Sequence, residues 1–323
     1  MAKIGEKFKP LNRQTIVITG ASSGIGLATA EMAARNGARV VISSRNEEDL
    51  NNIANKLNAR GAKVLAIKAD VTKIEDLQNL RKQAIDTFGS IDTWINNAGS
   101  SIYGPLLEIP EEEERALFET NFWGVRHGCH VAVEALKERG GVLINVGSEP
   151  SPSTNPLQGI YSATKHAVKA YTDVLRMELE HDNIPIAVVL VRPTGIDTPL
   201  PDHAVNHLKG GSPSLPDPVY HPDFVARAIL ECAEKPKRDV FVGLPSRLTS
   251  FMELLMPKWA EKKSKKAAFT EQIRGTAIPH TKENEALNEA PLKEGELLGH
   301  HIGKIKTKKG MKSPHVTDSK IIH

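Results

Sequence analysis

Seven short runs of apolar, mostly β-branched residues recur along the chain, separated by longer stretches with helical spacing. Each run is too short and too continuously apolar for a half-exposed strand, which predicts strands of a parallel sheet covered on both faces. Repeated strand–helix–strand units predict an α/β fold, with a doubly wound, parallel seven-stranded sheet and right-handed crossovers. The runs are 15–19, 39–43, 63–68, 93–96, 142–146, 186–191 and 239–243.

The pattern changes after about residue 245. Residues 244–269 form one amphipathic helical stretch, and the chain from about 276 is polar and poor in core-forming residues, which predicts an extended or disordered segment. We expect a catalytic domain over residues 1–245 and a C-terminal extension over 246–323, made of a helix and a basic, flexible tail. The helix could contact an anionic membrane through residues 246–266, but packing over a pocket or a subunit interface is favoured. Its apolar face would comprise Leu248, Phe251, Leu254, Leu255 and Trp259, with Lys262, Lys263, Lys265 and Lys266 beyond.

Composition and charge exclude several classes of protein but do not indicate a function. At 40% hydrophobic and 25% charged residues, the chain is typical of a soluble globular protein, and a net charge of +3 gives no reason to expect a nucleic-acid partner. Two cysteines make no disulfide framework, so a reducing, cytoplasmic location is expected. Neither a secretory signal nor an apolar run of the ~20 residues needed to cross a membrane is visible.

A glycine-rich turn joins the first predicted strand to the first predicted helix, in the sequence TGASSGIG. Gly20 would permit the tight turn, while Gly24 and Gly26 would let the backbone approach a pyrophosphate at the helix N-terminus. Ser22 and Ser23 add hydroxyl donors. A turn without ligand needs only one glycine, so three on a strand–turn–helix favour a dinucleotide site.

The end of the second strand should set the choice between NAD and NADP. A carboxylate there would bind the adenosine ribose, but this chain has Ser44 and Arg45. The guanidinium offers a planar fork for a 2′-phosphate, so NADP(H) is favoured over NAD(H). Arg45 could instead be a solvated residue at a helix start. Asp70 is placed to meet the adenine amino group, or alternatively to cap the next helix.

The stretch YSATK should begin a helix that puts Tyr161 and Lys165 one turn apart on the same face. With 4 tyrosines and 42 lysines plus arginines in the chain, chance alone would give about half a match to this spacing. Only the surrounding motifs can decide whether Tyr161 and Lys165 take part in catalysis.

Taken together, TGASSGIG, NNAG at 96–99, Asn121, Ser148 and YSATK resemble, in order and spacing, the single-domain branch of the short-chain dehydrogenases/reductases, over about residues 12–245. The resemblance implies a Rossmann fold, the catalytic tetrad Asn121, Ser148, Tyr161 and Lys165, and a homodimer or homotetramer. The cofactor-binding residues it implies, together with those read above, are Gly20, Ser22, Ser23, Gly24, Ile25, Gly26, Ser44, Arg45, Asp70, Val71, Asn97, Ala98, Gly99, Tyr161, Lys165, Pro193 and Thr198.

The chemistry of the implied tetrad can be argued residue by residue. A free tyrosine has a pKa of about 10, and a nearby cation lowers it, so Lys165 and an oxidised nicotinamide would tune Tyr161 as a general acid/base. Ser148, just past the fifth strand, would hold the substrate oxygen. Asn121, in a predicted helix, would bind a water that links Lys165 to solvent.

One departure from the family pattern follows the sixth strand. Where Pro-Gly is usual, the chain has Pro193 and Thr194 before Gly195, so the loop path can differ, although Thr198 still fits a contact to the nicotinamide amide.

The substrate pocket should be formed by the loops 100–110, 149–158 and 199–220, and their sequences do not identify the substrate. Glu149 could contact the substrate or solvent. His203 and His207 fit a solvated pair better than a metal site, and no metal is assigned.

These features predict an NADP(H)-dependent oxidoreductase that interconverts an alcohol and a carbonyl of a small molecule. Two alternatives remain open. One is a catalytically silent, cofactor-binding regulator, and the other is an isomerase or epimerase that retains its cofactor.

Overall fold

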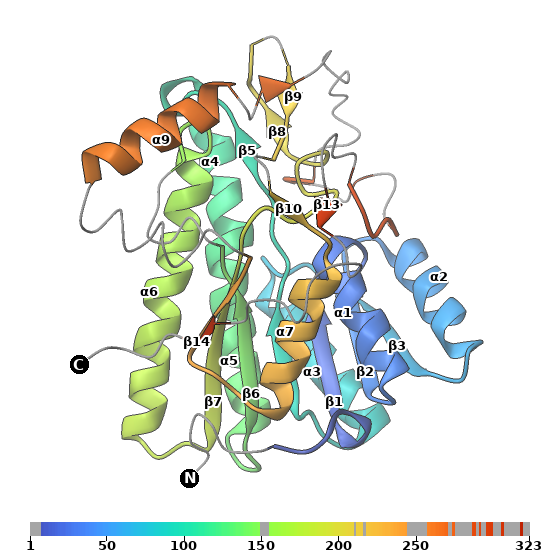
Figure 1. Cartoon of the computed structure of the whole chain (residues 1–323). Coiled ribbons are helices and arrows are strands. Elements are labelled where there is room, and N and C mark those ends of the chain that lie inside the picture. Colours follow the sequence, from blue (N-terminus) through green and yellow to red (C-terminus); the bar gives the residue numbers. More distant parts are fainter. Residues whose placement is uncertain are drawn as a thin grey trace.

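Seven parallel strands form the centre of the molecule, in the order β3-β2-β1-β4-β6-β7-β11 (Figure 1). The structure is a computed structural model and describes residues 8–148, 155–209, 211–215, 218–243 and 257–270, and beyond these only 273–274, 286–288, 291, 295–299, 305–306 and 317–318. The predicted doubly wound sheet is thereby confirmed. The strands are β1 (Thr15–Thr19), β2 (Arg39–Ser44), β3 (Lys63–Lys68), β4 (Thr93–Asn96), β6 (Gly141–Val146), β7 (Ile186–Pro193) and β11 (Asp239–Val242).

Strand β7 runs two residues beyond its predicted end at 191. Arg192 and Pro193 stay in the sheet because they pair with Phe241 and Val242 of β11. The Arg192 guanidinium lies 4.3 Å from the centre of the Phe241 ring, which gives this buried cation an aromatic face to stack on. Within the described chain, the two-residue strand β14 (Thr317–Asp318) pairs antiparallel with β11 at the same edge.

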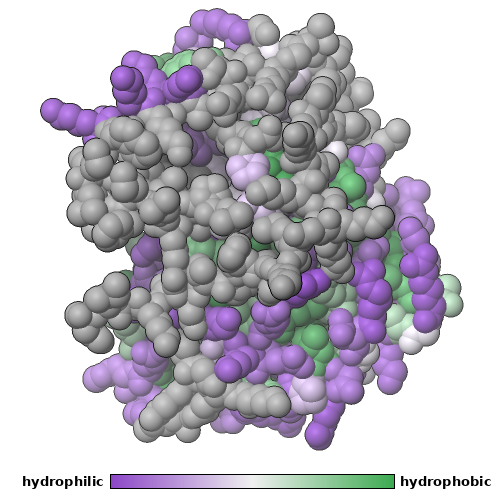
Figure 2. All heavy atoms as spheres, viewed as in Figure 1, coloured by the Kyte–Doolittle hydropathy of each residue, from purple (hydrophilic) through white to green (hydrophobic). Residues whose placement is uncertain are grey.

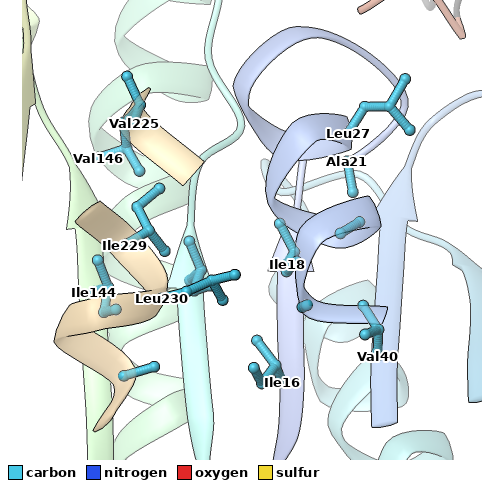
Figure 3. Close-up of a cluster of buried hydrophobic side chains, with 14 of the residues drawn as sticks. Ile16, Ile18, Ala21, Leu27, Val40, Ile144, Val146, Val225, Ile229 and Leu230 are labelled. Atoms are coloured by element: carbon cyan, nitrogen blue, oxygen red, sulfur yellow. The ribbon is translucent and has the colours of Figure 1, made fainter. Parts of the chain in front are cut away.

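Helices cover both faces of the sheet and divide the core into two layers. Helices α1, α2 and α7 bury side chains against one face, and α3, α5 and α6 against the other. Figure 3 shows part of the first layer, where Ile229 and Leu230 of α7 approach Ile144 of β6. The helices are α1 (Gly24–Arg35), α2 (Glu47–Asn58), α3 (Ile74–Phe88), α4 (Glu111–Phe118), α5 (Gly124–Leu136), α6 (Gly159–His181) and α7 (Asp223–Glu234), with 3-10 turns at Leu11–Arg13 and Leu106–Glu108.

The predicted helix around Asn121 contains a break in its regular pattern. Helices α4 and α5 are joined end to end by a π-helical segment, Glu119–Trp123, with Asn121 at its middle. A π turn carries an extra residue and often marks a functional site. Here it places a fully buried amide side chain in a helix interior.

The C-terminal extension is helical in α9 (Pro257–Thr270), whose Ser264 hydroxyl donates to Asn155 Oδ1 at 3.5 Å, beside the start of α6. Residues 244–256, which hold most of the predicted apolar face, lie outside the described residues. Further short strands are β5 (Ile102–Tyr103), β8 (Val205–Asn206), β9 (Ser212–Pro213), β10 (Val219–Tyr220), β12 (Ile273–Arg274) and β13 (Ile305–Lys306).

Hydrophilic residues dominate the described surface on the side shown in Figure 2, and hydrophobic residues show mainly in the gaps between them. In the parts of the chain that the structure covers, no helix combines the length and hydropathy required of a membrane span.

Candidate active site

The glycine-rich turn lies between β1 and α1, at the carboxyl edge of the sheet, where α/β folds bind ligands. Gly20 and Gly24 have φ of +62° and +48°, a region that favours glycine. A Cβ on Gly26 would lie 2.1 Å from the Gly20 carbonyl oxygen, so only glycine permits this close packing. Ser23 is the N-cap of α1, and its side chain makes no capping hydrogen bond, so the first helical N–H groups are left for other acceptors.

The NNAG segment fastens β4 to this turn. Asn97 Nδ2 donates to the carbonyl oxygens of Thr19 and Gly20 at 3.1 and 2.9 Å. The backbone N–H groups of Asn97 and Ala98 donate to Thr19 Oγ1 at 3.1 and 3.2 Å. Thr19, the first residue of the TGASSGIG motif, is therefore a supporting residue to which the motif alone gave no role.

Arg45 follows β2 and is not the solvated helix-start residue considered above. Helix α2 begins at Glu47 with Asn46 as its N-cap, and the Arg45 side chain is partly buried. Its guanidinium donates to the carbonyl oxygen of Ala286 at 2.7 Å and to that of Leu287 at 3.4 Å. The buried Ser44 lies immediately before it, at the end of β2.

Asp70 lies after β3, and the helix-cap alternative for it is wrong. Helix α3 begins at Ile74, and its N-cap is Lys73. Asp70 Oδ1 instead accepts hydrogen bonds from the Thr72 backbone N–H and hydroxyl, at 3.0 and 2.9 Å, which fixes the turn before the helix. Val71 lies within this turn, and its carbonyl oxygen is 3.2 Å from His127 Nδ1.

Tyr161, Ser148 and Lys165 come together at the same edge of the sheet. Helix α6 begins at Gly159, so Tyr161 and Lys165 lie one turn apart, and both are buried. A side-chain hydrogen bond links Tyr161 to Ser148. Lys165 Nζ lies 5.7 Å from the centre of the Tyr161 ring and donates to the Val146 carbonyl oxygen at 3.2 Å.

Burial shifts the pKa of both members of the YSATK pair toward the neutral forms. It raises the pKa of the Tyr161 phenol above its usual value, and the hydrogen bond with Ser148 opposes that rise. Burial also lowers the pKa of the Lys165 ammonium to about 8. In the protein by itself, the pKa of Tyr161 is therefore raised, whereas Lys165 was expected to lower it.

Asn121 is fully buried, and its side chain connects three parts of the site. Its Oδ1 accepts from the Ser100 backbone N–H at 2.9 Å, and its Nδ2 donates to the Ser100 carbonyl oxygen at 3.0 Å and to Thr164 Oγ1 at 3.1 Å. The Thr164 hydroxyl in turn donates to the Tyr161 carbonyl oxygen at 2.7 Å. The sequence motifs gave Thr164 no role of its own, although a hydroxyl three residues after Tyr161 shares its helix face.

Gly99 lies beside two of the predicted catalytic residues. A Cβ added at Gly99 would lie 3.2 Å from Asn121 Oδ1 and 3.7 Å from Lys165 Nζ. These polar atoms therefore flank the same spot, and a side chain at position 99 would intrude on it.

The loop after β7 brings Thr198 to the glycine turn. Pro193 ends β7, and the Thr194 N–H donates to the Val242 carbonyl oxygen at 3.0 Å, so the unusual Thr194 extends the pairing of β7 with β11. The buried Thr198 comes so close to Gly24 that a Cβ there would lie 3.0 Å from its side chain.

The expected solvated histidine pair is wrong for His207. Strand β8 replaces the short helix that would put His203 and His207 on one face. His207 Nε2 instead lies 2.6 Å from a Glu113 carboxylate oxygen, which ties the 199–220 loop to α4. No cluster of three metal-ligating side chains occurs among the described residues, and Glu149, together with most of the 149–158 loop, lies outside them.

The described residues fit a dinucleotide. The three glycines form a cradle that Cβ atoms would fill, the start of α1 presents backbone N–H groups, and Arg45 presents a cation at the end of the adjacent strand. Tyr161 and Lys165 lie at the carboxyl edge two strands further along, beyond β4 and beside β6.

Sequence comparison places the chain among known oxidoreductases. The model of the short chain dehydrogenase family matches residues 14–208. The uncharacterized oxidoreductase YxnA of Bacillus subtilis is 41% identical over 268 residues, which cover 82% of this chain and 75% of that protein.

Two solved structures share the fold. A short chain dehydrogenase/reductase from Burkholderia phymatum in complex with NAD has a TM-score of 0.66 at 24% identity, over 85% of this chain and 100% of that one. An alcohol dehydrogenase from the archaeon Thermococcus sibiricus, complexed with 5-hydroxy-NADP, has a TM-score of 0.62 at 29% identity, over 71% and 95%. The chain therefore belongs to the short-chain dehydrogenase/reductase family and is an oxidoreductase of that type.

Proposed function

We propose that the protein is an NADP(H)-dependent oxidoreductase that interconverts an alcohol and a carbonyl of a small molecule, with Tyr161 as general acid/base. The observation that carries the proposal is the hydrogen bond between the buried Tyr161 and the partly buried Ser148, with Lys165 Nζ 5.7 Å from the centre of the tyrosine ring. Two hydroxyls and a cation at one sheet edge suit proton transfer to and from a substrate oxygen.

The substrate oxygen would bind between the Ser148 and Tyr161 hydroxyls. In reduction, Tyr161 Oη donates its proton to that oxygen, while Ser148 Oγ holds the oxygen in place. In oxidation, Tyr161 Oη accepts the hydroxyl proton. When bound, NADP(H) supplies or accepts the hydride. Because burial raises the pKa of Tyr161 in the protein by itself, lowering it depends on the charge of the oxidised nicotinamide as well as on Lys165.

Lys165 and Asn121 would pass the proton on to solvent. We place the connecting water in the space beside Gly99, which both Lys165 Nζ and Asn121 Oδ1 flank. Asn121 is held there by Ser100 and Thr164, so its amide orientation is set by the protein. Lys165 Nζ would also hydrogen-bond the nicotinamide ribose.

The cofactor would lie across the glycine turn toward Arg45. The N–H groups at the start of α1 would bind the pyrophosphate, and the Arg45 fork would bind a 2′-phosphate, which favours NADP over NAD.

A homodimer or homotetramer is part of the proposal. Trp123, Val174 and Met177, on the helices that flank the candidate site, are 41%, 47% and 56% exposed despite their large apolar side chains. Such exposed apolar positions suit an interface between subunits.

The decisive experiment compares the wild type with Tyr161→Phe. NADPH oxidation is screened against diverse carbonyls, and NADPH binding is measured separately by fluorescence titration. We expect Tyr161→Phe to bind NADPH and to lose nearly all turnover, because the ring remains and the proton donor is gone. Retained turnover would refute the assignment of Tyr161. A lower KM for NAD than for NADP would refute the cofactor preference.

A further inference from the structure

The C-terminal segment formed by residues 286–288 and 295–299 lies on the residues proposed to bind the cofactor. We propose that this segment, called the strap below, competes with the dinucleotide for the groove, so that the chain inhibits its own cofactor binding. The inference rests on the proposed function, because it concerns the same groove.

The first observation is a pair of hydrogen bonds at the glycine turn. The Gly24 N–H, at the first position of α1, donates to the carbonyl oxygen of Glu296 at 3.0 Å, and the Gly295 N–H donates to the Ser22 carbonyl oxygen at 2.8 Å. The initial N–H groups of a helix are the donors that bind phosphate. One N–H cannot make a full hydrogen bond to a carbonyl and to a phosphate together, so Glu296 and a pyrophosphate exclude each other at Gly24.

The second observation is that the Arg45 guanidinium already donates hydrogen bonds to the strap. Both of its terminal nitrogens donate to strap carbonyl oxygens, those of Ala286 and Leu287. At both ends of the groove, carbonyl oxygens therefore take the place of phosphate oxygens. The Ala286 N–H also donates to the His203 carbonyl oxygen at 2.9 Å, which links the strap to the 199–220 loop.

Two leucines hold the strap in place. Leu287 is 4% exposed and belongs to the apolar cluster that contains Ile102, Tyr161 and Val205. Leu297 packs against the layer of core that includes Leu27 of α1. The strap backbone also presses on the loop after β7, because a Cβ on Gly299 would lie 2.3 Å from the Thr198 carbonyl oxygen. Apolar anchoring beside Tyr161 and at α1 explains how a segment outside the predicted catalytic domain reaches the groove.

Competition makes a quantitative prediction. If only the strap-free molecules bind NADPH, the apparent Kd exceeds the intrinsic Kd by a factor equal to the reciprocal of the strap-free fraction. A change that weakens the strap without touching the groove should therefore tighten NADPH binding.

Gly295→Ala in the full-length chain is such a change. Gly295 has φ of +93°, and an added Cβ would meet nothing within 4 Å, so the substitution strains only the docked strap. The matched control is Gly89→Ala, since Gly89 has φ of +82°, an equally open Cβ position and a site at the far end of α3. Leu287→Asp removes the buried anchor, and Leu298→Asp controls for it, because Leu298 is 39% exposed.

NADPH binding by fluorescence titration is the first readout. We expect the Kd to fall about five- to tenfold in Gly295→Ala and Leu287→Asp, and to stay at the wild-type value in both controls. The second readout is hydrogen exchange, in which NADPH should speed exchange at the Ala286 and Gly295 amides of the wild type, because binding releases their hydrogen bonds.

Two results would overturn the proposal that the strap competes with the cofactor. One is an unchanged or raised Kd in both strap variants, and the other is NADPH-induced protection of the Ala286 and Gly295 amides, which would make the segment a cover over bound cofactor. In either case the proposed function stands, because NADPH still binds. If neither NADPH nor NADH binds to the wild type or to any variant, the proposed function itself fails.

Discussion

Thr164 hydrogen-bonds Asn121 across the gap between two helices: its Oγ1 lies 3.1 Å from Asn121 Nδ2 and also donates to the Tyr161 carbonyl oxygen. A single hydroxyl thus joins the π-helical segment to the first turn of α6. Both ends of the proposed proton path are oriented through this side chain, which itself contacts neither reacting atom in the proposed mechanism.

Replacing Thr164 with Val should therefore loosen Asn121. Valine keeps the shape but removes both hydrogen bonds, so we expect unfolding to be easier by about 1–2 kcal/mol. We also expect kcat to fall several-fold with little change in the Kd for NADPH. Thr164→Ser should restore both, and the pH profile of kcat should move only in Thr164→Val. A stability loss with an unmoved kcat and pH profile would reduce Thr164 to a packing role.

Lys165→Met should stabilise the fold at neutral pH while abolishing activity. The pKa of Lys165 is about 8 in the folded protein and 10.5 as an ordinary lysine, so keeping it charged in the fold costs at most roughly 3 kcal/mol. Below pH 8 both states are protonated and the cost is fully present. As the pH rises from 8 toward 10.5, the folded state loses the proton first, and the wild type gains stability.

Urea unfolding at pH 7 and at pH 9.5 measures this difference. Lys165→Met should be more stable than the wild type by about 1–3 kcal/mol at pH 7, with a smaller gap at pH 9.5. Lys169→Met, one turn further along α6 in a partly exposed ion pair with Asp173, is the control and should gain nothing. If Lys165→Met proves less stable than the wild type at both pH values, the burial cost assigned to Lys165 is wrong.

Arg45→Gln should reverse the cofactor preference. Losing the charged fork should raise the KM for NADP about tenfold, because charge-assisted hydrogen bonds contribute about 1.5–3 kcal/mol. The KM for NAD, which carries no 2′-phosphate, should not rise. Arg60→Gln, in an exposed turn after α2, is a control for the loss of one positive charge. Equal effects on NADP and NAD would show that Arg45 does not recognise the extra phosphate.

Gly99→Ala tests the water proposed between Asn121 and Lys165. The methyl group would lie 3.2 Å from Asn121 Oδ1 and 3.7 Å from Lys165 Nζ, and would fill the space for the water. We expect kcat to fall about tenfold and the solvent isotope effect on kcat to increase, because proton transfer becomes slower. The Kd for NADPH should be retained within a factor of about two. An unchanged isotope effect would argue against a relay through this space.

Much of the fold was predictable because local sequence determines it. Runs such as TIVIT and KVLAIK are β-branched, continuously apolar and bounded by turn residues, and they became β1 and β3 with the predicted limits. The far end of β7 was missed because Arg192 is a charged residue in a buried strand. Its stacking on Phe241 joins residues 49 positions apart, and no local pattern announces such a pair.

The candidate site divides in the same way. The glycine turn and the Tyr161–Lys165 spacing follow from local backbone geometry, and the sequence shows both. The partners of Asn121 and the strap contacts of Arg45 depend on tertiary packing between distant segments, such as the 241 positions that separate Arg45 from Ala286. Hydropathy could not place the strap on the groove, because its main contacts are backbone carbonyl groups, which every residue has.

The π-helical segment Glu119–Trp123 also restricts how this stretch of chain can change in length. Removing one residue would restore a regular helix and turn α4 by about 100° relative to α5. Either Leu117 would then leave its buried cluster, or Asn121 would lose Ser100 and Thr164. Loops absorb single-residue deletions readily. A deletion in this segment would instead disrupt either the core packing of Leu117 or the hydrogen bonds of Asn121. Residues 111–136 therefore have a fixed length even where their exposed side chains are free to vary.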